Sequence, residues 1–96
     1  MGKIIIKKKI SIEIIIQNKL GIHCRPAALF VKTATKYESE VTVEKGDIKI
    51  SGKSLMGLLS SDIVYGTKIK IIACGIDAKE AIDELQKIIN DKFYLE

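Results

Sequence analysis

The stretch KIKIIACGIDAKEAIDELQKII, residues 68–89, combines the two hydrophobic periods that decide the fold. In residues 68–74 apolar side chains stand at every second position, which is the period of a strand with one buried face. From residue 78 the period changes to three and four positions, which is typical of an amphipathic helix. Asp77 and Glu80 have the spacing of a capping box at the start of that helix. The strand pattern rests on Ile69, Ile71 and Ala73, and the helical stripe on Ala78, Ala81, Ile82, Leu85, Ile88 and Ile89.

A second strand and helix precede this stretch. Residues 10–17 carry isoleucine at every even position, which predicts a strand with one buried face. A loop over residues 18–21 follows. Pro26 then stands where proline is tolerated, in the first turn of a helix that the apolar spacing predicts over residues 24–36. The apolar positions of this helix are Ala27, Ala28, Phe30, Val31, Ala34 and Tyr37.

The middle of the chain predicts a hairpin and a short helix. Residues 41–43 and 48–50 alternate in the manner of strands, and the sequence Lys45-Gly46-Asp47 between them indicates a turn. Ser54 is a favoured helix N-cap residue. Gly57 weakens the apolar segment after it, so we expect only one or two helical turns there.

The order of the predicted elements is strand, helix, strand, strand, short helix, strand, helix. This order suits an α+β fold of the open-faced β-sandwich type, a four-stranded antiparallel sheet covered on one face by three helices. A chain of 96 residues is enough for one domain, and no linker-like segment divides it. We assign residues 10–96 to that domain and residues 1–9 to an N-terminal extension of unknown use.

The composition is typical of a globular protein, with 47% hydrophobic and 29% charged residues. No apolar run approaches the roughly 18 residues that cross a bilayer, and the segment 4–6 is too short for the core of a signal peptide. Cys24 and Cys74 are too few and too widely spaced for a disulfide framework or a zinc site. We therefore expect a cytoplasmic protein with no membrane segment, no metal and no cofactor.

A net charge of +4 favours acidic partners. Fifteen of the sixteen cationic residues are lysines spread along the chain, which is typical of a solvated surface. Five aromatic residues are little provision for stacking on bases, so nucleic acid is not an expected partner.

The histidine, the arginine and the proline of this chain, one of each, lie within four residues, His23-Cys24-Arg25-Pro26, where a loop meets a helix. A helix N-terminus has unpaired N–H groups and a partial positive charge, and Arg25 adds donors that match phosphate or carboxylate. An anion on His23 would be held from two sides. A ring nitrogen of His23 is the candidate nucleophile. The spacing leaves open a plainer interpretation, in which His23 caps the helix and Arg25 is a surface charge.

The segment Gly21-Ile22-His23-Cys24-Arg25-Pro26-Ala27-Ala28 closely resembles the phosphorylation-site signature of the histidine-containing phosphocarrier (HPr) family of the bacterial sugar phosphotransferase system. The segment Lys53-Ser54-Leu55-Met56-Gly57 resembles the second motif of that family, and the similarity runs from about residue 10 to residue 89. The resemblance implies that His23 accepts phosphate, on Nδ1, from phosphorylated enzyme I and donates it to the EIIA domains of sugar permeases. Arg25 would steady the phosphoryl group. The protein would then be a stoichiometric carrier and not an enzyme.

The resemblance also implies regulation at Ser54, which matches the serine that HPr kinase/phosphorylase modifies in many members. Phosphate at Ser54 would add about −1.5 to −2 charges beside an apolar patch and hinder an acidic partner. The plainer alternatives are that Ser54 is an ordinary N-cap and that some patch residues belong to the core. The residues implied in partner docking are Cys24, Ala28, Leu55, Met56 and Leu59.

Two features of these motifs suggest other chemistry. Cys24 stands where Ala or Thr is common in the family, and a cysteine at a helix start can be reactive, but we interpret it as a small filler. The residues Gly52-Lys53-Ser54 imitate the end of a phosphate-binding P-loop. Asp47 occupies the position of the first glycine of that motif, so we reject this interpretation.

Two hypotheses therefore differ in function. The first is a monomeric phosphocarrier that acts through His23 and Arg25. The second is a regulatory interaction protein of the same fold that acts through Ser54, for example on a transcriptional regulator. The presence of His23 favours the first, since members that only regulate can dispense with that residue.

Overall fold

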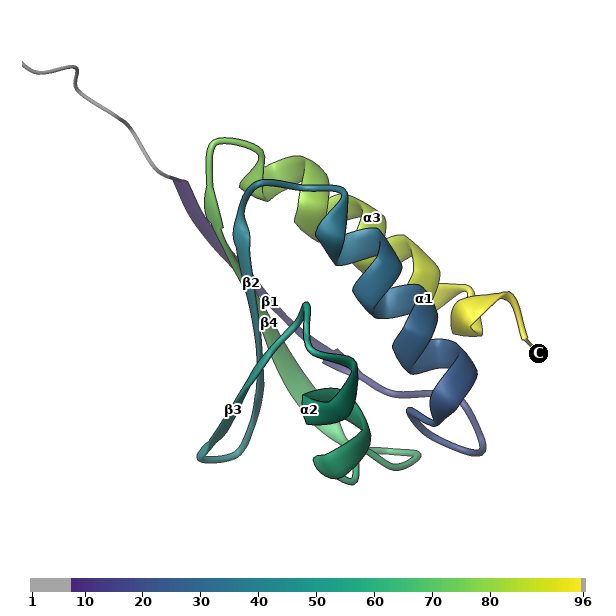
Figure 1. Cartoon of the computed structure of the whole chain (residues 1–96). Coiled ribbons are helices and arrows are strands. Elements are labelled where there is room, and N and C mark those ends of the chain that lie inside the picture. Colours follow the sequence, from purple (N-terminus) through teal and green to yellow (C-terminus); the bar gives the residue numbers. More distant parts are fainter. Residues whose placement is uncertain (1–7, 96) are drawn as a thin grey trace, which may run out of the picture.

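Within residues 8–95, which this computed structural model describes, four antiparallel strands form one sheet and three α-helices cover one of its faces (Figure 1). The strand order is β1-β4-β2-β3. The α+β open-faced fold predicted from the sequence is confirmed. The strands are β1 (Lys8–Ile15), β2 (Glu40–Lys45), β3 (Ile48–Ser51) and β4 (Lys68–Gly75). The helices are α1 (Cys24–Thr35), α2 (Leu55–Ser60) and α3 (Ala78–Asn90), followed by the short 3-10 helix η1 (Lys92–Tyr94).

Strand β1 pairs along its whole length with β4, from Lys8 opposite Gly75 to Ile15 opposite Lys68. Its even-numbered isoleucines pack against the core, and the residues between them, Ser11 and Glu13, are exposed, as the alternation predicts. The strand begins at Lys8, so Lys8 and Lys9, which we assigned to the extension, belong to the sheet because they pair with the end of β4. The rest of the predicted extension, residues 1–7, lies outside the described residues.

The core lies between the sheet and the helices. All six residues of the stripe predicted for α3 are buried. In α1 the buried positions are partly different from the prediction, because a helical stripe that includes Pro26, Ala27 and Phe30 leaves Ala28 facing solvent. The buried residues of α1 are Pro26, Ala27, Phe30, Thr33 and Ala34.

The predicted hairpin and short helix are both present. Strands β2 and β3 pair with Lys45 opposite Ile48, so Gly46 and Asp47 form a two-residue connection. Gly46 has a φ of +57°, a conformation that glycine adopts without strain. Helix α2 is six residues long, and the Ser54 hydroxyl accepts a hydrogen bond from the Gly57 N–H at 3.0 Å. Ser54 is therefore the N-cap of α2.

Asp77 does not cap α3 in the way its spacing predicts. Within the part of the chain that the structure describes, its side chain makes no capping hydrogen bond. Its carboxylate instead accepts hydrogen bonds from the N–H groups of Glu38 and Ser39, at 2.8 and 2.9 Å, and from the Ser39 hydroxyl. The capping-box prediction is wrong because the connection between α1 and β2 presents three donors to this carboxylate. Asp77 thereby ties the start of α3 to the start of β2.

We expect this tie to weaken in acid. The Ser39 hydroxyl, with the N–H groups of Glu38 and Ser39, holds the pKa of Asp77 below its ordinary value of 3.8. Because the pKa is lower in the folded state, the stabilisation is present above the ordinary value and is lost as the pH falls through the folded value. Asp77→Asn should therefore lower the Tm at neutral pH and flatten its decline below about pH 4.

Thermal unfolding followed by circular dichroism over a range of pH measures this effect. Asp83→Asn is the matched control, since Asp83 is an exposed carboxylate of α3 that pairs with Lys79 at the surface. Equal pH dependence in the wild type and in Asp77→Asn would contradict the assignment.

Candidate functional site

His23 occupies the N-cap position of α1. Its backbone is extended, with φ −108° and ψ −163°, and its carbonyl accepts the first helical hydrogen bond from the Ala27 N–H at 2.9 Å. Within the described residues the His23 side chain makes no capping hydrogen bond. The imidazole is half-buried and is not used to close the helix. The backbone of His23 therefore caps α1, as the plainer interpretation expects. Its ring takes no part in that capping.

The loop before His23 is held by its backbone. The Gly21 N–H donates to the Asn18 carbonyl at 2.9 Å, and the Ile22 N–H donates to the Ile63 carbonyl at 2.8 Å. Gly21 has a φ of +67°, and a Cβ at this position would lie 2.5 Å from the Ile63 oxygen. Glycine thus allows a close approach that fixes where His23 emerges.

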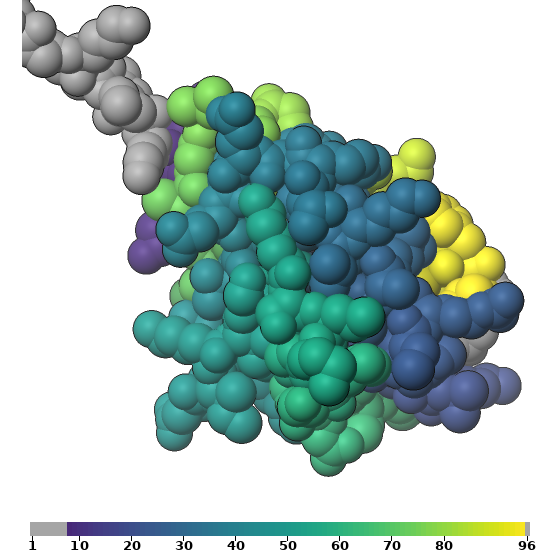
Figure 2. All heavy atoms as spheres, viewed as in Figure 1, coloured from purple at the N-terminus to yellow at the C-terminus, as the bar shows by residue number. Residues whose placement is uncertain are grey.

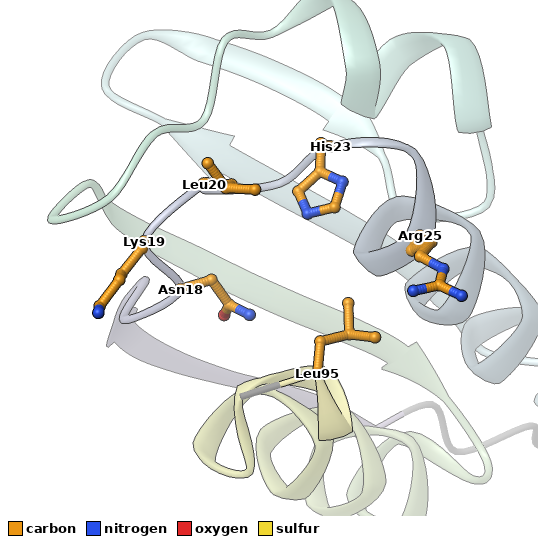
Figure 3. Close-up of a pocket in the computed structure, with 6 residues that line it drawn as sticks. All are labelled: Asn18, Lys19, Leu20, His23, Arg25 and Leu95. Carbon is orange, nitrogen blue, oxygen red and sulfur yellow. The ribbon is translucent and has the colours of Figure 1, made fainter.

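His23 and Arg25 both line an open cavity of about 510 Å³ at the start of α1. Figure 3 shows the imidazole and the guanidinium on the same side of the helix start, with Leu95 from the C-terminal segment facing them. The residues that line the cavity are Asn18, Lys19, Leu20, His23, Arg25 and Leu95. Of these, only His23 and Arg25 were predicted from the sequence; Asn18, Lys19, Leu20 and Leu95 were not.

The electrostatics of this cavity favour an anion. The N–H groups of Cys24 and Arg25 belong to the first turn of α1, where helical geometry leaves them without an acceptor in the helix, and Pro26 has no N–H. The helix end adds a partial positive charge, and the Arg25 guanidinium adds a full one. The first turn, residues 24–27, contains no acidic residue to compete for these donors. A phosphoryl group on the His23 ring fits this arrangement.

The second motif forms an exposed apolar patch. Leu55 and Met56 are 40% and 69% exposed, and Leu59 is half-buried against the core, while Leu58 is the buried residue of α2. Figure 2 shows α2, in green, beside α1, in blue, on one face of the molecule. Cys24 and Ala28 of α1 are exposed. The structure therefore leaves all five residues implied in docking at least partly accessible.

Other kinds of site find no support in residues 8–95. No group of three or more His, Cys, Asp or Glu side chains in this range could hold a metal ion. Within the same residues no helix is long and apolar enough to cross a membrane. Cys24 and Cys74 are both free thiols.

Comparison with known proteins identifies the family. Residues 10–91 match the family model described as the PTS HPr component phosphorylation site. The chain is 45% identical over 85 residues to the phosphocarrier protein HPr of Neisseria meningitidis, which covers 88% of this chain and 93% of that protein. It is 40% identical over 74 residues to the HPr-like protein Crh of Bacillus subtilis, with coverage of 77% and 87%.

A solved structure agrees with these sequence matches. The structure of HPr-C-His from Thermoanaerobacter tengcongensis aligns with a TM-score of 0.87 at 45% identity and covers 90% of this chain and 97% of that one. The four-stranded sheet and three helices described above are thus the HPr architecture. The chain belongs to the HPr family, the phosphocarrier proteins of the phosphotransferase system.

Replacement of Gly21 should disturb the loop that positions His23. We expect Gly21→Ala to lower the free energy of unfolding by about 1–3 kcal/mol, because the new methyl group meets the backbone of Ile63 and Val64, which cannot move aside easily. Urea denaturation measures this loss. Gly46→Ala is the matched control, since Gly46 has a similar φ of +57° but no described atom within 4 Å of the added Cβ. Equal losses in the two variants would show that the close approach of Gly21 is unimportant.

Proposed function

We propose that His23 accepts a phosphoryl group from phosphorylated enzyme I and donates it to the EIIA domain of a sugar permease. The observation that carries this proposal is the joint position of the His23 ring and the Arg25 guanidinium at one open cavity at the start of α1. A cavity open to solvent allows two successive partners to reach the same ring. Membership of the phosphocarrier family supports the same chemistry.

The transfer requires little covalent chemistry from this chain. In the first step a ring nitrogen of His23, Nδ1 by resemblance to the family, bonds to phosphorus as the bond from phosphorus to enzyme I breaks. In the second step the new N–P bond breaks as the acceptor on EIIA bonds to phosphorus. Such a transfer depends on positioning and on stabilisation of charge. In our proposal the Arg25 guanidinium and the first-turn N–H groups of α1 supply that stabilisation.

The strength of this binding suits a carrier. A helix end stabilises an anion by about 0.3–1 kcal/mol, and each charge-assisted hydrogen bond adds about 1.5–3 kcal/mol. Together these interactions hold the phosphoryl group firmly but still allow release to a partner. We propose that the protein is a stoichiometric carrier. In this proposal it acts in the cytoplasm as a monomer and needs no cofactor.

We assign partner docking to the apolar patch beside the site. Leu55 and Met56 are exposed large apolar side chains on α2, and α2 lies beside α1. Exposed apolar residues of this kind mark contact surfaces in soluble proteins. The net charge of +4 favours partners with acidic surfaces around an apolar centre.

The carrier function is tested by incubation with enzyme I and phosphoenolpyruvate, followed by intact mass measurement. The wild type should gain one acid-labile phosphate, and His23→Ala should gain none because the chain contains no other histidine. Arg25→Ala should still be phosphorylated but about 10- to 100-fold more slowly, because it lacks the charge-assisted hydrogen bonds. Absence of phosphate on the wild type, with an enzyme I that is active on another carrier, would overturn the proposal.

We further propose that phosphorylation of Ser54 regulates docking. The Ser54 hydroxyl accepts a hydrogen bond from the Gly57 N–H, so a phosphate at this position would sit at the start of α2, next to Leu55 and Met56. The added charge would repel an acidic partner. A regulatory role as a second function is supported by the 38% identity to Crh of Bacillus subtilis, whose solved structure is described as that of the catabolite repression HPr.

The charge effect at Ser54 can be measured with Ser54→Asp, which keeps a side chain able to cap α2. We expect the KM for transfer to EIIA to rise about tenfold with little change in kcat, because the repulsion acts on docking and not on the ring of His23. Ser11→Asp, which places the same charge on the opposite face of the sheet, should behave as the wild type. Equal KM values for the two variants would argue against regulation by charge at Ser54.

A further inference from the structure

Asn18 links the loop before His23 to the other end of the chain. Its side chain is 2% exposed, and its Nδ2 donates to the Lys92 carbonyl at 2.9 Å, across 74 positions of sequence. Its backbone carbonyl accepts from the Gly21 N–H and so closes the turn that leads to His23. One buried residue therefore holds two segments that meet at the cavity.

The segment that Asn18 contacts has an unusual backbone. Lys92, Phe93 and Tyr94 have φ values of +53°, +56° and +61°, three consecutive non-glycine residues in the left-handed region. Such a conformation persists where the surrounding structure imposes it. Phe93, which is 1% exposed, anchors the segment in the core, and Asn18 anchors its first carbonyl. This left-handed turn determines the position of the next residue, Leu95.

Leu95 lies at the cavity together with His23 and Arg25. Figure 3 shows its side chain facing the imidazole and the guanidinium across the cavity, with Asn18 to its left. Leu95 remains 41% exposed, so it is not placed there by core packing alone. An apolar side chain contributes nothing to anion binding, but it can keep water away from a bound group.

We propose that Asn18 is a positioning residue that fixes the left-handed turn so that Leu95 shields the phosphorylated ring of His23 from water. The inference rests on the proposed function, because it concerns the same ring. In the reaction that is suppressed, a water oxygen bonds to phosphorus, the N–P bond breaks, and inorganic phosphate and unmodified His23 are released. Slow hydrolysis is a requirement for a carrier, since each loss to water wastes one phosphoryl group.

The hydrogen bonding of the Asn18 side-chain amide indicates that Asn18 acts as a hydrogen-bond donor. Within the described residues, its Oδ1 is the buried side-chain polar atom that has no hydrogen-bond partner, whereas its Nδ2 is bonded to Lys92. Asn18→Asp keeps the size of the side chain but removes the donor and turns an oxygen toward the Lys92 carbonyl. This variant therefore removes the contact to Lys92, but it also adds a negative charge at the cavity, so the uncharged Leu95→Ala is the cleaner test of the shield.

The test loads His23 chemically with phosphoramidate and then follows the release of inorganic phosphate at neutral pH without any partner. Chemical loading is specific for His23 because it is the chain's one histidine, and it does not require enzyme I. We expect Asn18→Asp and Leu95→Ala to lose phosphate about threefold or more faster than the wild type. The double variant should be no faster than Leu95→Ala, because Asn18 acts through Leu95.

Two control variants make the outcome decisive. Tyr94→Ala alters the same turn at an exposed side chain that does not line the cavity, so its half-life should match the wild type. Leu95→Met should restore slow hydrolysis, because it restores an apolar side chain of similar size. Circular dichroism checks that each variant is folded. If Asn18→Asp does not fold, the rate of phosphate release from Leu95→Ala alone tests the proposal.

The inference is overturned if Leu95→Ala hydrolyses at the wild-type rate, or if the double variant is much faster than Leu95→Ala. Failure of enzyme I to phosphorylate the wild type, with normal hydrolysis differences after chemical loading, would instead overturn the proposed function alone.

Discussion

The antiparallel pairing of β1 with β4 is the constraint on which the site depends. Ile15, at the end of β1, lies opposite Lys68, at the start of β4, so the loop that leads to His23 begins where β4 begins. β4 runs away from this point, and α3 returns along the sheet toward it. The C-terminal turn therefore reaches the same end of the molecule as His23. One strand pair thus brings the loop before α1 and the C-terminal turn to a single cavity.

The sequence predicted the elements well and some of their polar contacts poorly. The even-numbered isoleucines of β1 and the buried stripe of α3 follow from periodicity, because burial on one face of a strand or helix is a local property of the pattern. The hydrogen-bond partner of a polar side chain, in contrast, can lie far away in the sequence, where a local pattern does not reveal it. Asp77 has the spacing of a cap, but the donors of Glu38 and Ser39, about 40 positions earlier in the chain, approach it in the folded state.

The same distinction holds at the site. His23 and Arg25 could be singled out from the sequence because a helix start, the proposed nucleophile and the proposed anion-binding side chain lie within three residues. Leu95 could not, since its place at the cavity depends on the buried Phe93 and on a hydrogen bond from Asn18. The left-handed φ values of residues 92–94 have no signal in the sequence, where no glycine marks them. Ala28 is exposed because the buried stripe of α1 runs along the side of the helix that carries Ala27 and Phe30. The spacing of apolar residues alone did not show which side this is.

The strand order also determines when the site can form during folding. The β2–β3 hairpin joins neighbouring residues, whereas β1 and β4 are separated by more than half of the chain. Pairings between distant segments close long loops and form late, so local hairpins and helices precede them. The segment that carries His23 follows β1 directly, and the wall that faces it comes last in the sequence. A partly folded or newly synthesised chain would therefore hold the histidine but lack its surroundings, so under the proposed function complete folding precedes the uptake of phosphate.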